Sequence, residues 1–320
     1  MDSTRGTSVD SSESENPPVD NASRKRRYLC DEEVRELLRE RGFADAGTDS
    51  ALHLLSRVSY QHLSPYLTAV EKAGCKKSLK HAHDLLTLDR RFQSMAFKYI
   101  GMFETQFRAA YSSAMAREHG DFALYDAGVF LRGDLYGKTR SAYDAEVLRK
   151  ARRSPLVKQE LADNGGMMPV WHSVEFMTLG TLSKFFSNTG DRAVTRSVLD
   201  SFGVRKREFS SWVRTITAAR NIFAHFGHYL VSSQIPSIPL SVHGAGMPNT
   251  APLYLVVLLY RLLDAPDVSG DPNMRYAERL RDETLALLGS FYGTYGDSVS
   301  VPGIPDDWRS ALSFWDMRSV

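Results

Sequence analysis

The chain has 320 residues, of which 42% are apolar and 24% charged, and its formal net charge is +2. This composition is ordinary for a globular protein, and no apolar run reaches the roughly 18 residues of a membrane span. Two cysteines, Cys30 and Cys75, argue against a disulfide framework, and nine histidines without paired metal spacing argue against a zinc site. We therefore expect a cytoplasmic protein without a membrane segment, metal or other cofactor.

The N-terminal segment differs from the rest of the chain. Residues 1–23 are polar and carry five carboxylates against Arg5, a net charge of −4, so we expect a disordered tail. A basic run follows, which is either a solvated domain edge or an arm that contacts RNA phosphates; its residues are Arg24, Lys25, Arg26 and Arg27. The predicted organisation is a tail over 1–27 and one helical domain over 28–320.

From residue 28 the apolar spacing predicts helices. Asp31 can begin the first helix and Gly42 can stop it, and a second helix covers about 49–58. An aromatic turn is expected over 60–66. The longest helix is expected over 84–119, because its large apolar residues recur with a period of 3.6.

The second half of the chain is also predicted to be helical. The expected helices cover about 143–153, 170–186, 191–201, 207–229, 254–263 and 275–288. A loop is expected over 232–250, where prolines and glycines gather, and the tail is expected to pack back through Trp308 and Trp315. Alternating strand patterns are scarce, so the predicted fold class is all-α.

The helix predicted over 207–229 contains the candidate site. Arg220 and His225 lie in an apolar, helix-forming stretch, with Asn221 between them and His228 beyond. Arginine presents a flat fork of donors to phosphate, and histidine transfers protons near neutral pH. This pair suits cleavage of RNA by its own 2′-hydroxyl, a reaction that needs no metal.

The helical spacing predicts a site shared between two copies. If the helix continues through Gly227, then Asn221, His225 and His228 share one stripe, while Arg220 lies about 140° from His225. Two copies around a twofold axis bring arginine and histidine from both chains into one cleft. Small side chains at Ala224 and Gly227 allow that close approach, so we expect a homodimer.

Each residue has an expected role in transesterification. His225 acts as general base on the 2′-hydroxyl or as general acid on the leaving 5′-oxygen, and Arg220 stabilises the charge at phosphorus. Asn221 orients His225 or holds a phosphate oxygen, and His228 is a candidate second proton-transfer group. Glu104 and Arg108, at i and i+4, form a salt bridge, or Glu104 holds Arg220 across the core.

Several blocks of the sequence carry a family resemblance. The run Met168–Lys184 is similar to a Pro-Ile-Trp…Glu-x-Met-Ser-Phe-Gly-Thr-Leu-Ser segment, and Ser59–Tyr66 to a Ser-Tyr-Tyr-Arg-Leu-Ser-Gly-Tyr block. Asp89-Arg90 and Glu104…Arg108 match the long helix, and Gly303–Trp308 matches a closing Gly-x-Pro-x-x-Trp. Through these blocks the chain resembles the Abi-like family of abortive-infection proteins, of the AbiD/AbiF type, within the HEPN superfamily.

The resemblance implies a HEPN-like helical bundle with additional helices, and a function. The superfamily's pattern of Arg, a polar residue and a later His maps onto Arg220, Asn221 and His225. It implies a metal-independent endoribonuclease at a dimer interface, used in phage defence or a toxin–antitoxin system. Its implied partners are substrate RNA and, in some members, a small non-coding RNA.

The chain departs from the family pattern after the arginine. Phe223 replaces a Cys, Phe226 a second His and His228 a second Arg, and Val231 stands near the usual Asn. Two other functions therefore stay open. One is a non-catalytic module that binds a companion RNA, and the other is an interaction protein whose dimer groove binds a phage or host protein.

Overall fold

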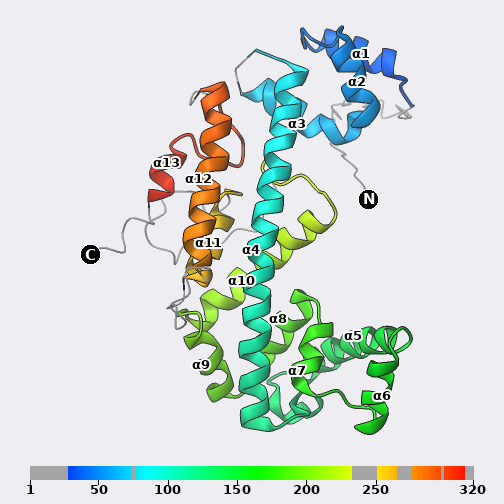
Figure 1. The fold of residues 1–320 in the computed structure, drawn as a ribbon, viewed down its shortest axis with the longest axis vertical. Coiled ribbons are helices and arrows are strands. Elements are labelled where there is room, and N and C mark those ends of the chain that lie inside the picture. Colours follow the sequence, from blue (N-terminus) through cyan, green and yellow to red (C-terminus); the bar gives the residue numbers. More distant parts are fainter. Residues whose placement is uncertain (1–27, 74–75, 233–250, 265–274, 297–298, 314–320) are drawn as a thin grey trace, which may run out of the picture.

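The computed structural model describes residues 28–73, 76–232, 251–264, 275–296 and 299–313. These ranges form an all-α fold without a β-strand, as the sequence predicts (Figure 1). The predicted tail over 1–27 with its basic run, the loop predicted over 232–250 apart from residue 232, and Trp315 lie outside the described residues. The helices are α1 Asp31–Glu40, α2 Asp49–Arg57, α3 Tyr60–Lys72, α4 Leu79–His119, η1 Ala123–Tyr125, η2 Ala127–Val129, α5 Gly133–Ala151, α6 Pro155–Asp163, α7 Val170–Ser173, η3 Val174–Phe176, α8 Leu179–Asn188, α9 Arg192–Asp200, α10 Lys206–Ala224, α11 Tyr254–Leu263, α12 Tyr276–Tyr295 and α13 Trp308–Ala311.

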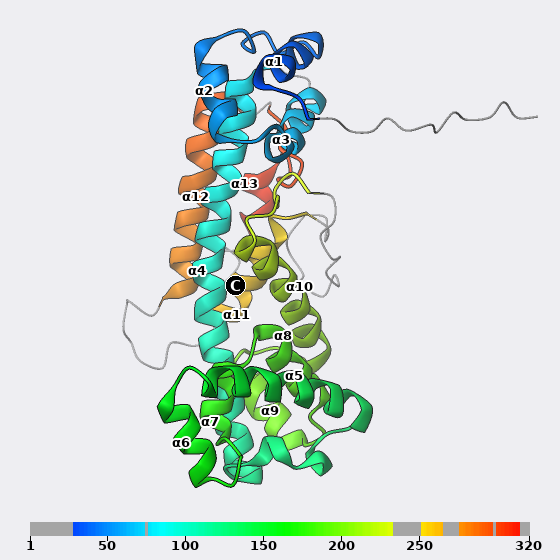
Figure 2. The same cartoon turned by 90° about the vertical axis from the view of Figure 1, so that its right-hand side faces the viewer.

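The 41-residue helix α4 is the axis of the molecule. At about 1.5 Å per residue it is roughly 60 Å long, and the other described helices are arranged along it (Figures 1 and 2). Helices α3, α11 and α12 pack on its N-terminal part, while α7, α8 and α9 pack on its C-terminal part. Helix α10 spans the two parts and contacts α4, α8, α9 and α11.

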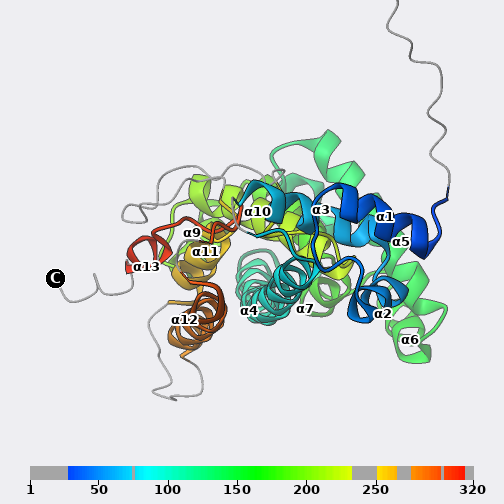
Figure 3. The ribbon, with the colours of Figure 1, turned by 90° about the horizontal axis from the view of Figure 1, so that it is seen from above.

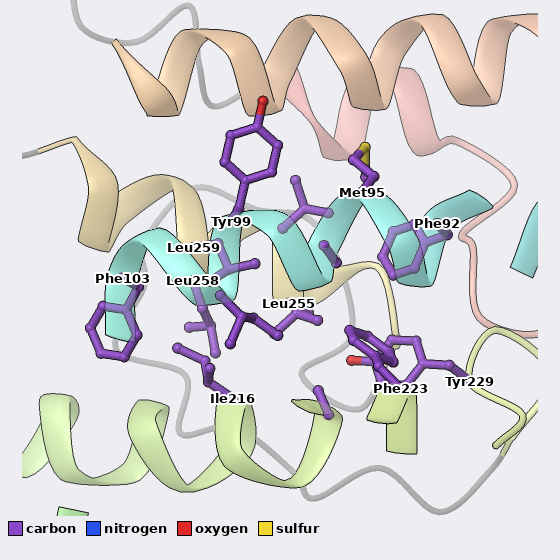
Figure 4. Packing of buried hydrophobic residues seen from close by; sticks show 14 of the residues in the cluster. Phe92, Met95, Tyr99, Phe103, Ile216, Phe223, Tyr229, Leu255, Leu258 and Leu259 are labelled. Carbon is purple, nitrogen blue, oxygen red and sulfur yellow. The ribbon is translucent and has the colours of Figure 1, made fainter. Parts of the chain in front are cut away.

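Helix α4 begins five residues before its predicted start because two side chains cap it. Asp45 accepts hydrogen bonds from the backbone N–H groups of Leu79 (2.7 Å) and Lys80 (3.0 Å), and Ser78 accepts one from His81 N–H. The cap satisfies donors that a helix start otherwise leaves open. The buried stripe of α4 meets α10 and α11, with Ile216 and Leu258 between the helices (Figures 3 and 4).

The aromatic turn predicted over 60–66 is wrong. These residues begin α3, which Ser59 caps by accepting a hydrogen bond from the His62 N–H. Pro65 removes one backbone hydrogen-bond donor from the interior of the helix. The next two residues, Tyr66 and Leu67, are fully buried. Burial of this apolar face against α4 outweighs the lost hydrogen bond.

The helix predicted over 170–186 is broken in two. Helix α7 and η3 end at Phe176, and Thr178 caps α8 by accepting a hydrogen bond from Thr181 N–H at 3.1 Å. Arg108 donates to the carbonyl oxygens of Val174 (2.6 Å) and Met177 (2.8 Å) at the break. The Val174 oxygen also accepts the Met177 N–H (3.3 Å). A side chain from α4 therefore stabilises the break, and the sequence around the break does not predict this contact.

The other predicted helices differ from the structure mainly in their ends. Helix α11 has the predicted bounds, α12 continues to Tyr295, and α5 begins at Gly133, ten residues before its predicted start. Trp308 is buried and stacks on Tyr292 with ring centroids 5.5 Å apart, so the C-terminal segment packs back as expected.

Candidate functional site

Helix α10 carries the candidate residues near its C-terminal end. Its apolar residues repeat at helical spacing and face the core, and they are Phe209, Trp212, Val213, Ile216, Ala219 and Phe223. Phe223, which stands where the family pattern has Cys, packs edge-on against Tyr229 at 4.9 Å between ring centroids (Figure 4). Core packing on one side therefore fixes which side of α10 the polar residues occupy.

The predicted continuation of α10 to residue 229 is wrong, because the helix ends at Ala224. Phe226 N–H bonds to Phe223 O (3.1 Å) and Gly227 N–H bonds to Ile222 O (2.8 Å). This pair of bonds is the Schellman motif, which needs a left-handed residue after the cap. That residue is Phe226, with φ 51°, the sole described non-glycine with positive φ.

The three predicted catalytic residues have no side-chain partners among the described residues. Arg220 is half-buried, and Asn221 and His225 are exposed. Their side chains form no hydrogen bond or ion pair with any residue in the described ranges. Polar groups that stabilise a fold are normally partnered, so free ones on a rigid helix end are available to a ligand.

His228 does not share a helical stripe with Asn221 and His225, since the chain has already left the helix. Its ring packs on His62 (4.8 Å between centroids) and Tyr66 (5.4 Å), and its Nε2 lies 3.0 Å from His62 O. His228 is thus half-buried against α3. These contacts assign it to the support of the segment after α10 rather than to the exposed face of His225.

A buried carboxylate on α4 holds that segment. Asp89 is 0% exposed, and its two oxygens accept four hydrogen bonds. The donors are the Tyr229 N–H (2.9 Å), the Leu230 N–H (3.1 Å), the Tyr66 hydroxyl (2.7 Å) and the Gln93 amide (3.0 Å). Burial, together with the charge of Asp89, raises the pKa of Tyr66, which keeps its hydroxyl a donor.

Arg90, the next residue on α4, holds the left-handed turn itself. It donates to Phe226 O (2.7 Å), Gly227 O (3.3 Å) and the Gln93 side-chain oxygen (3.1 Å). It also lies 2.5 Å from Nε2 of His62. Burial, with the charges of Arg90 and His228, lowers the pKa of His62, so this nitrogen accepts the hydrogen bond.

Asp89 and Arg90 match the family resemblance on the long helix, but their sequence positions do not connect them with the site. One signal was available, because Asp89 interrupts the apolar stripe that Leu85 and Phe92 define on α4. A carboxylate in such a position must be partnered. Its partners, the backbone N–H groups some 140 residues later, are set by tertiary structure alone.

Glu104 and Arg108 lie in the structure on α4 and form the ion pair that their spacing predicts. Arg108 is also 3.6 Å from Glu175, in addition to its bonds to the break before α8. The alternative, in which Glu104 holds Arg220, is not seen, since the Glu104 carboxylate is used by Arg108. This pair braces α4 against the segment 174–177.

A cavity of about 520 Å³ opens beside His225. It lies between α4 and the C-terminal end of α10, and Ala224 and Phe226, the chain neighbours of His225, both line it. The other lining residues are Arg90, Gln93, Ser94, Phe97 and Phe223. No lining residue of this cavity carries a carboxylate, so the cavity suits a neutral or anionic ligand.

Across the described ranges, no three His, Cys, Asp or Glu side chains cluster closely enough to bind a metal ion. None of the helices in these ranges combines the length and apolarity needed to cross a bilayer.

Comparison with known proteins identifies a family match. The profile of the Abi-like protein family matches residues 53–229, which is more than half of the chain and includes α3, α4 and all of α10. No curated protein and no solved structure matches the chain significantly.

Proposed function

Because the chain belongs to the Abi-like protein family, we propose that it is a metal-independent endoribonuclease of the HEPN type. In this proposal it acts in phage defence by abortive infection, or as a toxin under the control of a companion RNA. The observation that supports it best is the free arginine and histidine at the end of α10. Arg220 and His225 lack protein partners among the described residues, next to a cavity without carboxylates.

The proposed reaction is an intramolecular transesterification. The 2′-oxygen forms a bond to phosphorus while the bond from phosphorus to the 5′-oxygen breaks. His225 takes the proton of the 2′-hydroxyl or supplies one to the leaving 5′-oxygen. The guanidinium of Arg220 stabilises the negative charge that develops on the phosphoryl oxygens, and Asn221 orients a phosphate oxygen or His225.

The proposal includes a homodimer. Arg220 and His225 are five residues apart around a helix end, so their side chains diverge within one chain. The exposed His225 of one copy supplies one proton transfer, and the same residue of a second copy supplies the other. The products are a 2′,3′-cyclic phosphate and a 5′-hydroxyl.

Cleavage in the presence of EDTA tests the proposal. The full-length protein is incubated with total RNA, and the ends of the fragments are mapped. We expect cyclic-phosphate ends that disappear with Arg220→Ala and with His225→Ala. Matched controls are Arg214→Ala, an exposed arginine on the same helix, and His53→Ala, an exposed histidine on α2. Ends that persist in the Arg220 and His225 variants contradict the mechanism.

The runner-up function is a module that binds RNA without cutting it. It is favoured by Phe226 and His228, which stand where the family pattern has a second His and a second Arg. Retarded but intact RNA in the same experiment supports this function. The absence of both binding and cleavage favours an interaction protein with a phage or host partner.

A further inference from the structure

We propose that the cavity beside His225 is a nucleobase subsite, which holds one unpaired base of a single-stranded RNA next to the scissile phosphate. The proposal rests on the proposed ribonuclease function and adds the substrate class. A base inside a duplex is stacked on both faces and is not available to such a cavity. The subsite therefore selects single-stranded segments.

Two exposed aromatic side chains line the cavity. Phe97 on α4 is 41% exposed and Phe226 after α10 is 70% exposed, although large apolar side chains are usually buried. Aromatic faces of this kind stack on unpaired bases without regard to sequence. The cavity volume of about 520 Å³ is within the roughly 300–1,000 Å³ of ligand sites.

The backbone fixes the position of Phe226 at a cost. A left-handed φ of 51° is unfavourable for a residue with a side chain, and glycine is the usual choice there. Arg90 binds the Phe226 carbonyl at 2.7 Å, and its guanidinium lies 5.5 Å from the centre of the Phe226 ring. Phe226 thus has an unfavourable backbone conformation, is held by Arg90 and keeps its ring exposed. Binding of a ligand explains this combination better than packing within the chain does.

The charges around the cavity fit an RNA strand. The hydrogen-bond acceptors of Arg90 are neutral, so no ion pair within the described residues compensates its charge. Ser94 lines the cavity with a hydroxyl that has no partner in the described residues, and this hydroxyl can reach a base edge.

The cavity is placed correctly for the reaction. Ala224 and Phe226 line it, so the backbone of His225 lies beside it, and Arg220 is one turn before Ala224 on the same face of α10. A base in the cavity therefore brings its phosphate to the end of α10, which carries both residues. Arg90 and Ser94 also line a second cavity of about 560 Å³ towards α12, whose other charged lining residues are Arg91 and Glu283, and Glu283 is paired with Lys98.

The test uses the full-length protein carrying His225→Ala, which removes the proposed proton transfer but keeps Arg220 for the phosphate, so that RNA is bound but not cut. Eight-nucleotide single-stranded RNAs, each with one abasic position, are titrated and followed by fluorescence anisotropy. We expect one abasic position to weaken binding by roughly 5- to 150-fold, the range for loss of one stacked base. Phe226→Gly, which suits the left-handed backbone, should remove this positional effect. Leu156→Ser, an exposed apolar residue on α6 (78% exposed), should preserve it.

Three results would overturn the proposal: no RNA binding, equal effects at all abasic positions, or a positional effect that Phe226→Gly leaves unchanged. If Phe226→Gly instead converts dimers to monomers, with RNA binding unaltered, a second copy of the chain fills the cavity. Failure of the ribonuclease proposal is distinguishable from these results, because it gives intact RNA with wild-type protein while the positional effect remains.

Discussion

Two arginines near the end of α10 differ completely in their surroundings. Arg90 on α4 directs its guanidinium to the Phe226 and Gly227 carbonyls and to two neutral side chains. The side chain of Arg220 has no partner in the described ranges. The first arginine fixes the backbone that carries His225, and the second is left for a ligand. The residue type alone therefore does not tell a structural arginine from one that can bind a ligand. The number of hydrogen bonds that each side chain makes within the described residues does.

The histidines show the same contrast. His62 and His228 pack on each other and are hydrogen-bonded, whereas His225 is exposed and unpartnered among the described residues. The polar residues around the candidate site thus divide into an inner network centred on Asp89 and an outer face of Arg220, Asn221 and His225. Four predictions test this division, in order of decreasing effect on stability.

Asp89→Asn should cause the largest loss. The amide replaces one carboxylate oxygen by a donor, so two of the four groups that Asp89 binds are left without an acceptor. We expect the free energy of unfolding to fall by about 2–4 kcal/mol, as measured by urea denaturation. A change below about 0.5 kcal/mol would show that the inner network is not needed to hold the segment 226–230.

Gly303→Ala tests the contact between the C-terminal segment and the chain after α10. An added Cβ would meet Leu230 O at 2.5 Å and Pro252 Cγ at 2.6 Å, so the backbone must move. We expect a loss of about 1–3 kcal/mol in the same measurement. The matched control, Gly289→Ala in α12, has open space around the added atom and should gain about 0.5–1 kcal/mol. Equal effects for the two variants would contradict the close approach.

Acidification should weaken the inner network through His62. Burial and the charges of Arg90 and His228 hold its folded-state pKa below the usual value of about 6.5. The unfolded chain therefore takes up a proton first, and stability falls as the pH drops below about 6.5. Urea midpoints at about pH 7.5 and 5.5 measure this loss, which should shrink in His62→Gln. If the loss of stability between these pH values is the same in His62→Gln, then protonation of His62 does not cause it.

Arg220→Ala and His225→Ala should change the free energy of unfolding least, by no more than about 0.5 kcal/mol, because their side chains bind no other described residue. In the proposed function the same variants lose RNA cleavage. Thermal melts beside the cleavage assay measure both quantities. A large stability loss would place these residues in the inner network and remove the contrast between the two arginines.

Much of the fold could be predicted from single residues and their spacing. The period of 3.6 over α4 indicated its length, and Tyr254–Leu263 was predicted with the bounds of α11. Failures occurred where a distant side chain decides the local structure. Arg108 stabilises the break before α8, Asp45 extends α4 towards its N-terminus, and burial outweighs Pro65 in α3.

The candidate site shows the same limit. Arg220, Asn221 and His225 could be named from the sequence, because their chemistry and spacing are local properties. The residue at which α10 ends could not be predicted from the sequence. Gly227 is the residue type that usually takes the left-handed position after a helix, but in the structure Phe226 takes it. That choice is stabilised by hydrogen bonds from Arg90, 136 residues earlier in the chain. The cavity also depends on α4 and α10 together.

The sequence by itself determined the helical class, the order of most helices and the identity of the arginine and histidine at the candidate site. These follow from periodicity and side-chain chemistry, which act over a few residues. Only the tertiary structure decided which polar residues are used internally, where α10 ends and which aromatic side chains remain exposed beside His225. These features depend on hydrogen bonds and packing between segments more than a hundred residues apart, and no local pattern encodes such pairings.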